Sequence, residues 1–366
     1  MKSTKFKNKN IHIFNSHGIG DVIMTIPLIT RVLRENPKKI SLTLKSEIEK
    51  NIIDIFFPNQ NIKFFFFKNK KNISFKNFSF IRSLRKEKID LIIFTEGIDT
   101  KRSLFLSLLL NIRKSIPTKL NLILKILKND IDSSVHKAIK NYKLITNNFE
   151  KDDFDLSSKC YFNTEDLLII KKTFKDKNIK IKENFIVIAP GSGELESYKR
   201  WPVERYKKLI LKITNLFPEI TIFILGNDLE EKIGKELSQI NRNIRNLCGE
   251  LSIKESMYLL SLCKISITNC NGVSHMAGAV GSVVIGIYGP TDYKKTGPFT
   301  NNLFPVTEKN YAPWYSKKNI DGLNNSSDLK DVSEDDVLKV FLNVFQKDKK
   351  DFLGKAYRHV ELEKLL

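Results

Sequence analysis

One segment, residues 268–292, constrains the fold of this chain more than any other. It predicts a turn of small residues, a short helix that begins near Asn271 and Gly272, and an apolar strand over residues 283–288. Asparagine is a good helix N-cap, and such an apolar run is typical of a strand covered on both faces. A glycine-bearing turn that opens a helix behind a parallel strand is a ready site for a phosphate or diphosphate. The segment therefore predicts a nucleotide-type ligand in the C-terminal half.

The rest of the chain alternates short apolar strands with helices, which indicates parallel sheets. Strands are expected at residues 11–14, 40–44, 62–67, 90–94, 185–189, 220–225 and 265–268, and helices at 22–35, 80–88, 165–175, 203–215, 229–240 and 332–346. Ser252 and Glu255 have the spacing of a capping box. We expect an α/β fold of two Rossmann-like parallel-sheet domains facing a central cleft, with ligands at the carboxyl ends of the strands. The expected limits are 1–150 and 185–346, with a linker at 151–184 and a charged tail at 347–366.

Several classes of protein are disfavoured by composition. The basic N-terminus precedes only a short apolar strand, so no signal peptide is expected. The longest apolar run, near residues 104–110, is far shorter than the roughly 20 residues that cross a bilayer. The cysteines lack the spacing of a zinc site or disulfide framework, and free thiols in a reducing cytoplasm fit better: they are Cys160, Cys248, Cys263 and Cys270.

The positive charge of the chain is uneven. Residues 1–150 hold 29 Lys and Arg against 12 Asp and Glu, whereas residues 151–366 hold 33 against 29. The first half therefore predicts an anionic partner: a membrane surface, a phosphorylated lipid or nucleic acid. Nucleic acid is disfavoured, because the sequence has no helix-turn-helix, RNP or zinc signature. The alternative explanation for the total net charge of +21 is compositional drift in a chain rich in Lys, Asn, Ile and Phe. Drift explains the uneven distribution of charge between the two halves less well.

The first candidate site follows the strand at residues 11–14. Gly18 and Gly20 match only the first two glycines of a dinucleotide fingerprint, and Ile23 stands at the third position, so a dehydrogenase is a weak interpretation. Asp21 heads a helix at the end of a strand, where a carboxylate could act as a general base. The alternative is that Asp21 only stabilises the helix N-terminus, by about 0.3–1 kcal/mol.

The second candidate site follows the strand at residues 185–189. A Gly/Ser loop containing Ser192 precedes Lys199 and Arg200. These cations suit a diphosphate, since Lys199 would supply a point charge and Arg200 a planar guanidinium that can donate two parallel hydrogen bonds. The alternative is an ordinary loop with solvated charges. His275, in the first turn of the helix after Asn271, is either a core histidine or a phosphate contact. The residue types at 289–292 are primarily those of a tight turn. Because this turn follows a strand, a binding role is the second interpretation. Acidic pairs at 130–132 and 152–155 are weak candidates for a metal-binding motif.

Taken in chain order, these motifs resemble glycosyltransferase family 9, the lipopolysaccharide heptosyltransferases of Gram-negative bacteria. The similarity spans roughly residues 10–345 and lies in Gly20-Asp21-Val22 with Thr25-Ile-Pro27, Pro190-Gly191, Lys199-Arg-Trp-Pro202, Gly226 with Glu230, and residues 247–255, 269–275 and 289–292. Glu96-Gly97 stands where Gln-Gly is usual in the family. Any one of these motifs is weak, but their ordered series is strong.

The resemblance implies a GT-B fold and metal-independent, inverting transfer of a sugar, with ADP-heptose as the donor and no cofactor. Asp21 would be the base, and the acceptor region would include Gly18, Gly20 and Glu96. The donor diphosphate would be held by Ser192, Lys199, Arg200, Asn271, Gly272 and His275, and Cys270 would lie in the donor-sugar region. The implied acceptor is the phosphorylated inner core of lipopolysaccharide. The implied location is the cytoplasm, at the anionic inner face of the inner membrane of a Gram-negative bacterium.

Three departures limit the transfer of these roles. Cys270 replaces the family's Asp, Asn271 its Ser/Thr, and Val273-Ser274 its Pro-Met. A thiol is a poor acceptor, so one hydrogen bond worth roughly 1.5–3 kcal/mol would be lost if it went to a buried charged group. Two alternatives therefore stay open: a family 9 transferase with another nucleotide sugar, or a catalytically silent paralogue that binds a nucleotide sugar.

Overall fold

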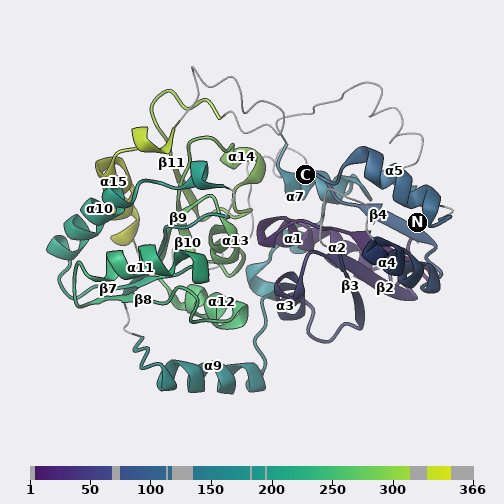
Figure 1. Cartoon of the computed structure of the whole chain (residues 1–366), viewed down its shortest axis with the longest axis horizontal. Helices are drawn as coiled ribbons and strands as arrows, with labels where there is room; N and C mark the ends of the chain where they lie inside the picture. Colours follow the sequence, from purple (N-terminus) through teal and green to yellow (C-terminus); the bar gives the residue numbers. More distant parts are fainter. Residues whose placement is uncertain are drawn as a thin grey trace. The chain divides into compact units, whose positions relative to one another are not determined.

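The computed structural model describes residues 5–67, 75–112 (backbone only for 75–78), 114–117, 135–181, 184–193, 196–313 and 328–347 (Figure 1). The chain divides into two compact units, and the division falls between Lys159 and Cys160. This point lies inside the segment expected as a linker. All of the expected C-terminal tail except Lys347 lies outside the described residues.

The first unit is built on a five-stranded parallel sheet with the order β3-β2-β1-β4-β5. Its strands are β1 (Asn10–Phe14), β2 (Lys39–Leu44), β3 (Ile62–Phe66), β4 (Leu91–Phe94) and β5 (Lys114–Ile116). Its helices are α1 (Ile19–Ile23), α2 (Ile26–Leu33), α3 (Glu47–Phe56), α4 (Phe75–Lys86), α5 (Thr100–Leu109), α7 (Lys137–Lys143) and α8 (Lys151–Phe154). Strand β1 is central, so the residues that follow it lie at the middle of the carboxyl edge.

The single helix expected over residues 22–35 is wrong, because the chain forms α1 and α2 in succession. Met24 ends α1 and Thr25 begins α2, with Pro27 in the first turn. Proline suits a first turn because it has no N–H to leave unpaired, and it disfavours continuation of a preceding helix. The break leaves Asp21 in a helix of five residues beside the carboxyl end of β1.

The second unit is built on a six-stranded parallel sheet with the order β11-β10-β9-β6-β7-β8. Its strands are β6 (Phe185–Ala189), β7 (Thr221–Ile224), β8 (Ile244–Asn246), β9 (Ile265–Asn269), β10 (Val283–Ile287) and β11 (Leu303–Val306). The three central strands are buried at every residue, as their apolar runs predict. The unpredicted strands β8 and β11 are the two edges, where partial burial gives no continuous apolar pattern.

The helices of the second unit are α9 (Thr164–Asp176), α10 (Val203–Leu216), α11 (Glu231–Ser238), α12 (Ile253–Leu262), α13 (Gly272–Ala279), α14 (Tyr293–Thr296) and α15 (Glu334–Phe345) (Figure 1). Of these, α10, α11 and α15 pack on the sheet around a core that contains Trp201, Tyr206 and Phe341. The capping box of Ser252 and Glu255 is confirmed at the start of α12. Across the described ranges, no helix is long and apolar enough to span a membrane.

A histidine is buried in the first sheet. His12 on β1 is fully buried, with Nδ1 2.8 Å from the Ser41 hydroxyl and Nε2 2.8 Å from the Thr43 hydroxyl. The rings of Phe14 and Phe65 meet it edge-on. Burial lowers the pKa of His12 to about 3, because the imidazolium would lose its hydration.

We predict that His12 makes the first unit less stable in acid. Below pH 6.5 the unfolded chain binds a proton at His12 that the folded chain does not bind until about pH 3. The free energy of unfolding attributable to this group is therefore fully present above pH 6.5. It falls by about 1.4 kcal/mol per pH unit as the pH drops toward 3. Urea unfolding from pH 7 to 4 should show this extra slope in the wild type and not in His12→Asn. Equal slopes in the two proteins would contradict the prediction.

Candidate active site

Asp21 is held by an ion pair at the carboxyl edge of the first sheet. Its carboxylate accepts a hydrogen bond from the ammonium of Lys137, the first residue of α7. The Asp21 side chain is 28% exposed and that of Lys137 14% exposed. Asp21 is therefore fixed in direction and still reachable from solvent. Lys137 was not selected from the sequence, because it lies 116 positions further along the chain.

Buried polar side chains hold the backbone behind Asp21. Thr25 Oγ1 donates to the Asp21 carbonyl at 2.8 Å, and Asn15 Nδ2 donates to the same carbonyl at 3.2 Å and to Thr25 Oγ1 at 2.9 Å. Asn141 Nδ2 lies 3.3 Å from Thr25 Oγ1, and its Oδ1 accepts from the Glu96 N–H at 2.8 Å. This network ties the ends of the paired strands β1 and β4 to α7.

The three residues predicted for the acceptor region lie at the same edge. Gly18 is the N-cap of α1, Gly20 lies in that helix, and Glu96 follows the end of β4 by two residues. A Cβ on Gly18 would meet no atom within 4 Å, so the space beside its backbone is open. The structure thus groups Gly18, Gly20, Asp21 and Glu96 within the first unit.

In the second unit, two asparagines hold the loop after β6 against the end of β9. Asn269 Nδ2 donates to the Pro190 carbonyl at 2.6 Å and to that of Gly191 at 3.2 Å. Asn271 Nδ2 donates to the Gly191 carbonyl at 2.9 Å. Asn271 is also the N-cap of α13, where its Oδ1 accepts from the Ser274 N–H at 3.0 Å, as the sequence predicted. The loop and the head of α13 therefore form one joined edge.

The predicted cations follow that loop. Lys199 is only 8% exposed, and its ammonium lies 2.6 Å from the Glu196 carboxylate. Arg200 Nε donates to Ser192 Oγ at 3.0 Å, and Ser192 Oγ donates to the Glu196 carbonyl at 2.7 Å. Ser192, Lys199 and Arg200 are therefore brought together as expected. Glu196 joins them, although no motif pointed to it.

The head of α13 completes the candidate diphosphate site. The helix begins at Gly272, and His275 lies in its first turn with 6% of its surface exposed. N–H groups and the helix dipole at such an end favour an anion. The helix is closely packed behind its head, since a Cβ on Gly278 would lie 2.8 Å from the Pro298 Cβ.

Cys270 precedes the N-cap of α13 and has tyrosines as electrostatic neighbours. Tyr288 is completely buried, and among the described residues its hydroxyl has no hydrogen-bond partner. Burial raises the pKa of Tyr288 well above its usual value, and negative charge at Cys270 would raise it further. The rings of Tyr293 and Tyr311 stack with their centroids 5.7 Å apart, and the ring centroids of Tyr288 and Tyr293 are 5.5 Å apart. Cys270 is thus close enough to Tyr288 and Tyr311 for its charge to act on their hydroxyls.

Glu230 was noted in a motif but not selected as a site residue. It is 5% exposed, and its Oε2 accepts from the Asn227 N–H at 2.7 Å in a capping box. A Cβ on Gly191 would lie 2.0 Å from Glu230 Oε1, so the carboxylate fills the place beside that glycine. Burial raises the pKa of Glu230, and the charge of Arg200 opposes this. The spacing of Gly226 and Glu230 was the signal that could have found it.

The remaining sequence candidates have structural roles or fall outside the description. Gly289 packs against backbone, since its Cβ would lie 2.9 Å from the Leu329 nitrogen, and Asp292 caps α14. In the acidic run 152–155, Asp153 is buried and accepts from the Tyr142 hydroxyl at 2.6 Å. The run 130–132 lies outside the described residues. Within the described part of the chain, no group of three or more His, Cys, Asp or Glu could hold a metal ion.

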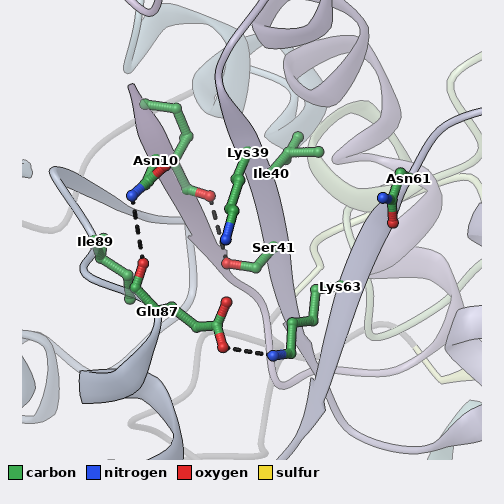
Figure 2. A pocket seen from close by; sticks show the side chains of 9 residues that line it. Asn10, Lys39, Ile40, Ser41, Asn61, Lys63, Glu87 and Ile89 are labelled. Atoms are coloured by element: carbon green, nitrogen blue, oxygen red, sulfur yellow. Dashed lines mark hydrogen bonds and ion pairs between the residues drawn. The ribbon is translucent and has the colours of Figure 1, made fainter. Parts of the chain in front are cut away.

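A cavity of about 180 Å³ lies at the other end of the first sheet, where its strands begin (Figure 2). It is lined by Asn10 and Lys39 and by the Lys63–Glu87 ion pair, whose N–O distance is 2.5 Å. Parallel α/β sheets bind ligands at their carboxyl ends. We therefore assign this cavity no part in the candidate active site.

The sequence profile of glycosyltransferase family 9 (heptosyltransferase) matches residues 77–323, which is more than half of the chain. This chain belongs to glycosyltransferase family 9. Lipooligosaccharide heptosyltransferase 2 of Campylobacter jejuni is 25% identical over 340 residues, covering 88% of this chain and 94% of that relative. The protein is therefore a glycosyltransferase, as its motifs predicted.

Solved structures of the family share the fold. Escherichia coli ADP-heptose lipopolysaccharide heptosyltransferase II matches with a TM-score of 0.65 at 18% identity, over 92% of this chain and 98% of that one. Escherichia coli heptosyltransferase WaaC, solved with ADP-2-deoxy-2-fluoro heptose, matches with a TM-score of 0.60 at 18% identity, over 91% and 99%. The GT-B fold class, with two parallel-sheet α/β domains, is confirmed.

We predict that Asn141 stabilises the edge of the first sheet at which Asp21 lies. Asn141→Ala leaves the Glu96 N–H without its side-chain acceptor and should lower the free energy of unfolding by about 1–3 kcal/mol. Asn147→Ala, on an exposed residue four positions beyond α7, should stay within about 0.5 kcal/mol. Urea unfolding measures both variants. Indistinguishable stabilities would mean that Asn141 does not support this edge.

Proposed function

We propose that this family 9 enzyme transfers heptose from ADP-heptose to the phosphorylated inner core of lipopolysaccharide, with inversion and without a metal ion. The observation that carries the proposal is Asp21, a carboxylate oriented by Lys137 and partly exposed at the carboxyl edge of a parallel sheet. The names of the relatives support the donor and the acceptor class. The basic first half of the chain suits a phosphorylated acceptor.

In the proposed reaction, each unit supplies one part of the chemistry. The Asp21 carboxylate takes the proton of the acceptor hydroxyl while the oxygen of that hydroxyl bonds to the anomeric carbon of heptose. The bond from that carbon to the diphosphate breaks, and ADP leaves. One displacement inverts the anomeric centre. The charge that develops on the diphosphate is stabilised by Lys199, Arg200 and the N–H groups at the head of α13, with Ser192 and His275 beside them.

We propose that the enzyme acts in the cytoplasm, at the inner face of the inner membrane. The acceptor that the relatives' names indicate is a lipid, and a lipid acceptor is reached at a membrane surface. Basic residues near an anionic bilayer each add roughly 1 kcal/mol of attraction. The excess of Lys and Arg in residues 1–150 supports this location.

We expect Asp21→Ala to lower turnover by about 10²–10⁴-fold, the usual share of a general base. Binding of ADP should stay within about twofold, because the proposed diphosphate contacts lie in the second unit. Radiolabelled heptose transfer and calorimetric titration with ADP measure the two effects. Asp54→Asn, on α3 of the same unit, is the matched control.

Undiminished turnover in Asp21→Ala would remove this residue from the mechanism. The anomeric configuration of the product, read by NMR, tests inversion separately. Retention of the donor's configuration would contradict the single displacement.

A second donor is the alternative that a specific observation favours. Cys270, beside Tyr288 and Tyr311, offers the donor sugar a thiol where the family pattern has a carboxylate. We predict that Cys270→Asp changes the ratio of kcat/KM between ADP-heptose and other nucleotide sugars by at least about tenfold, the size of one charged hydrogen bond. Steady-state kinetics with ADP-, UDP- and GDP-sugars measure the ratio.

Cys270→Ala controls for simple loss of the thiol and should change the ratio less than Cys270→Asp. An unchanged ratio in Cys270→Asp would remove this residue from donor choice. Tight nucleotide-sugar binding by the wild type without turnover of any donor would instead identify a catalytically silent protein.

A further inference from the structure

Helix α5 buries two serines and exposes two large apolar side chains. Its serines Ser103 and Ser107 are buried, at 1% and 0% exposure, whereas Phe105 and Leu108 are 53% and 58% exposed. The buried hydroxyls are satisfied locally: Ser103 Oγ donates to the Asp99 carbonyl at 3.0 Å and Ser107 Oγ to the Leu104 carbonyl at 2.8 Å. An ordinary surface helix buries its apolar stripe and exposes its polar one. The outward face of α5 is therefore suited to a partner that accepts apolar side chains.

The exposed apolar residues form one stripe with a cation. Lys101, Phe105 and Leu108 are spaced i, i+4 and i+7, so they lie on the same face of the helix. Leu106 and Leu110, on the opposite face, belong to the core that α5 shares with β1 and β4. The stripe is thus fixed outward by the packing of the helix.

Helix α5 and its neighbour α4 expose several cations. Helix α4 lies beside α5, since Arg85 of α4 donates to the Leu109 carbonyl. Helix α5 contains no acidic residue, and the Asp99 carboxylate at its N-cap accepts from the Arg102 N–H. Cations that are exposed on α4, α5 and β5 are Arg82, Arg85, Lys86, Lys101 and Lys114.

We infer that the outward face of α5, defined by Lys101, Phe105 and Leu108, docks on an anionic lipid bilayer. Apolar side chains rimmed by Lys and Arg match the boundary between acyl chains and negative headgroups. The helix starts at the acceptor edge, because its N-cap Asp99 follows Glu96 by three residues. Docking this face brings that edge to the surface where a lipid-linked acceptor is found. In this respect the inference rests on the proposed function.

The second unit offers a matched control surface. Leu168 and Ile169 on α9 are 64% and 55% exposed, about as much as Phe105 and Leu108. Their helix carries acidic and basic residues together, and its Asp166 pairs with Lys254 at 2.6 Å. Exposed apolar area is therefore similar on the two helices, while the surrounding charge differs.

The test is vesicle co-sedimentation of the full chain with vesicles of phosphatidylethanolamine and phosphatidylglycerol, and in parallel with phosphatidylcholine vesicles. The double variant Phe105→Ser with Leu108→Ser should bind the anionic vesicles at least about tenfold more weakly. Leu168→Ser with Ile169→Ser should bind like the wild type. Lys101→Glu should weaken binding to anionic vesicles about fivefold, with a smaller effect at high salt.

Each outcome separates docking from catalysis. Heptose transfer to a soluble, delipidated acceptor should be unchanged in the α5 variants, and their thermal melting should match the wild type. Absence of vesicle binding by the wild type, or equal binding by the α5 and α9 variants, would overturn the docking surface and leave the proposed reaction standing. Failure of the wild type to transfer to the soluble acceptor would count against the proposed reaction, whatever the vesicles show. If the α5 substitutions change only the oligomeric state in light scattering, the face is an interface between copies, and the inference is wrong.

Discussion

The second unit of this enzyme depends on the buried side-chain amide of Asn269, at the end of the central strand β9. The side-chain oxygen of Asn269 accepts from the backbone N–H of Trp201 at 3.2 Å and from the Tyr206 hydroxyl at 2.9 Å. The side-chain nitrogen donates to the carbonyls of Pro190 and Gly191 in the loop after β6. A buried amide is costly unless it is hydrogen-bonded. Because these bonds all converge on one side chain, the loop, the start of α10 and the end of β9 are fixed together. The groups proposed to hold a diphosphate start from that junction.

The first unit uses the same principle around Asn141. Asn141 connects α7 to the Glu96 backbone and to Thr25, which in turn holds the Asp21 carbonyl. In both units an asparagine turns the loose ends of parallel strands into a supported edge. Functional side chains need such support, since a site that is about an ångström too loose loses its chemistry. The hydrogen bonds of this network hold the backbone of Asp21, and the ion pair with Lys137 orients its carboxylate.

The two units differ in charge and in exposed apolar surface. The first half of the chain carries most of the excess positive charge, and α5 turns its apolar face outward there. The second half carries 33 Lys and Arg against 29 Asp and Glu, and its Lys199 and Arg200 lie beside the loop after β6. This division suits an enzyme that meets a large anionic acceptor with one unit and a small nucleotide sugar with the other.

The sequence by itself determined the α/β class, the central strands, the helix caps at Asn271 and Ser252, and the family. These features rest on residues close together in the chain, whose spacing shows directly. Only the tertiary structure decided the partners of Asp21, the place of Glu230 against Gly191, and the inward serines of α5. It also decided the edge strands β8 and β11. Contacts such as Asp21 with Lys137 join residues 116 positions apart, and no local pattern records which distant segment a fold brings alongside.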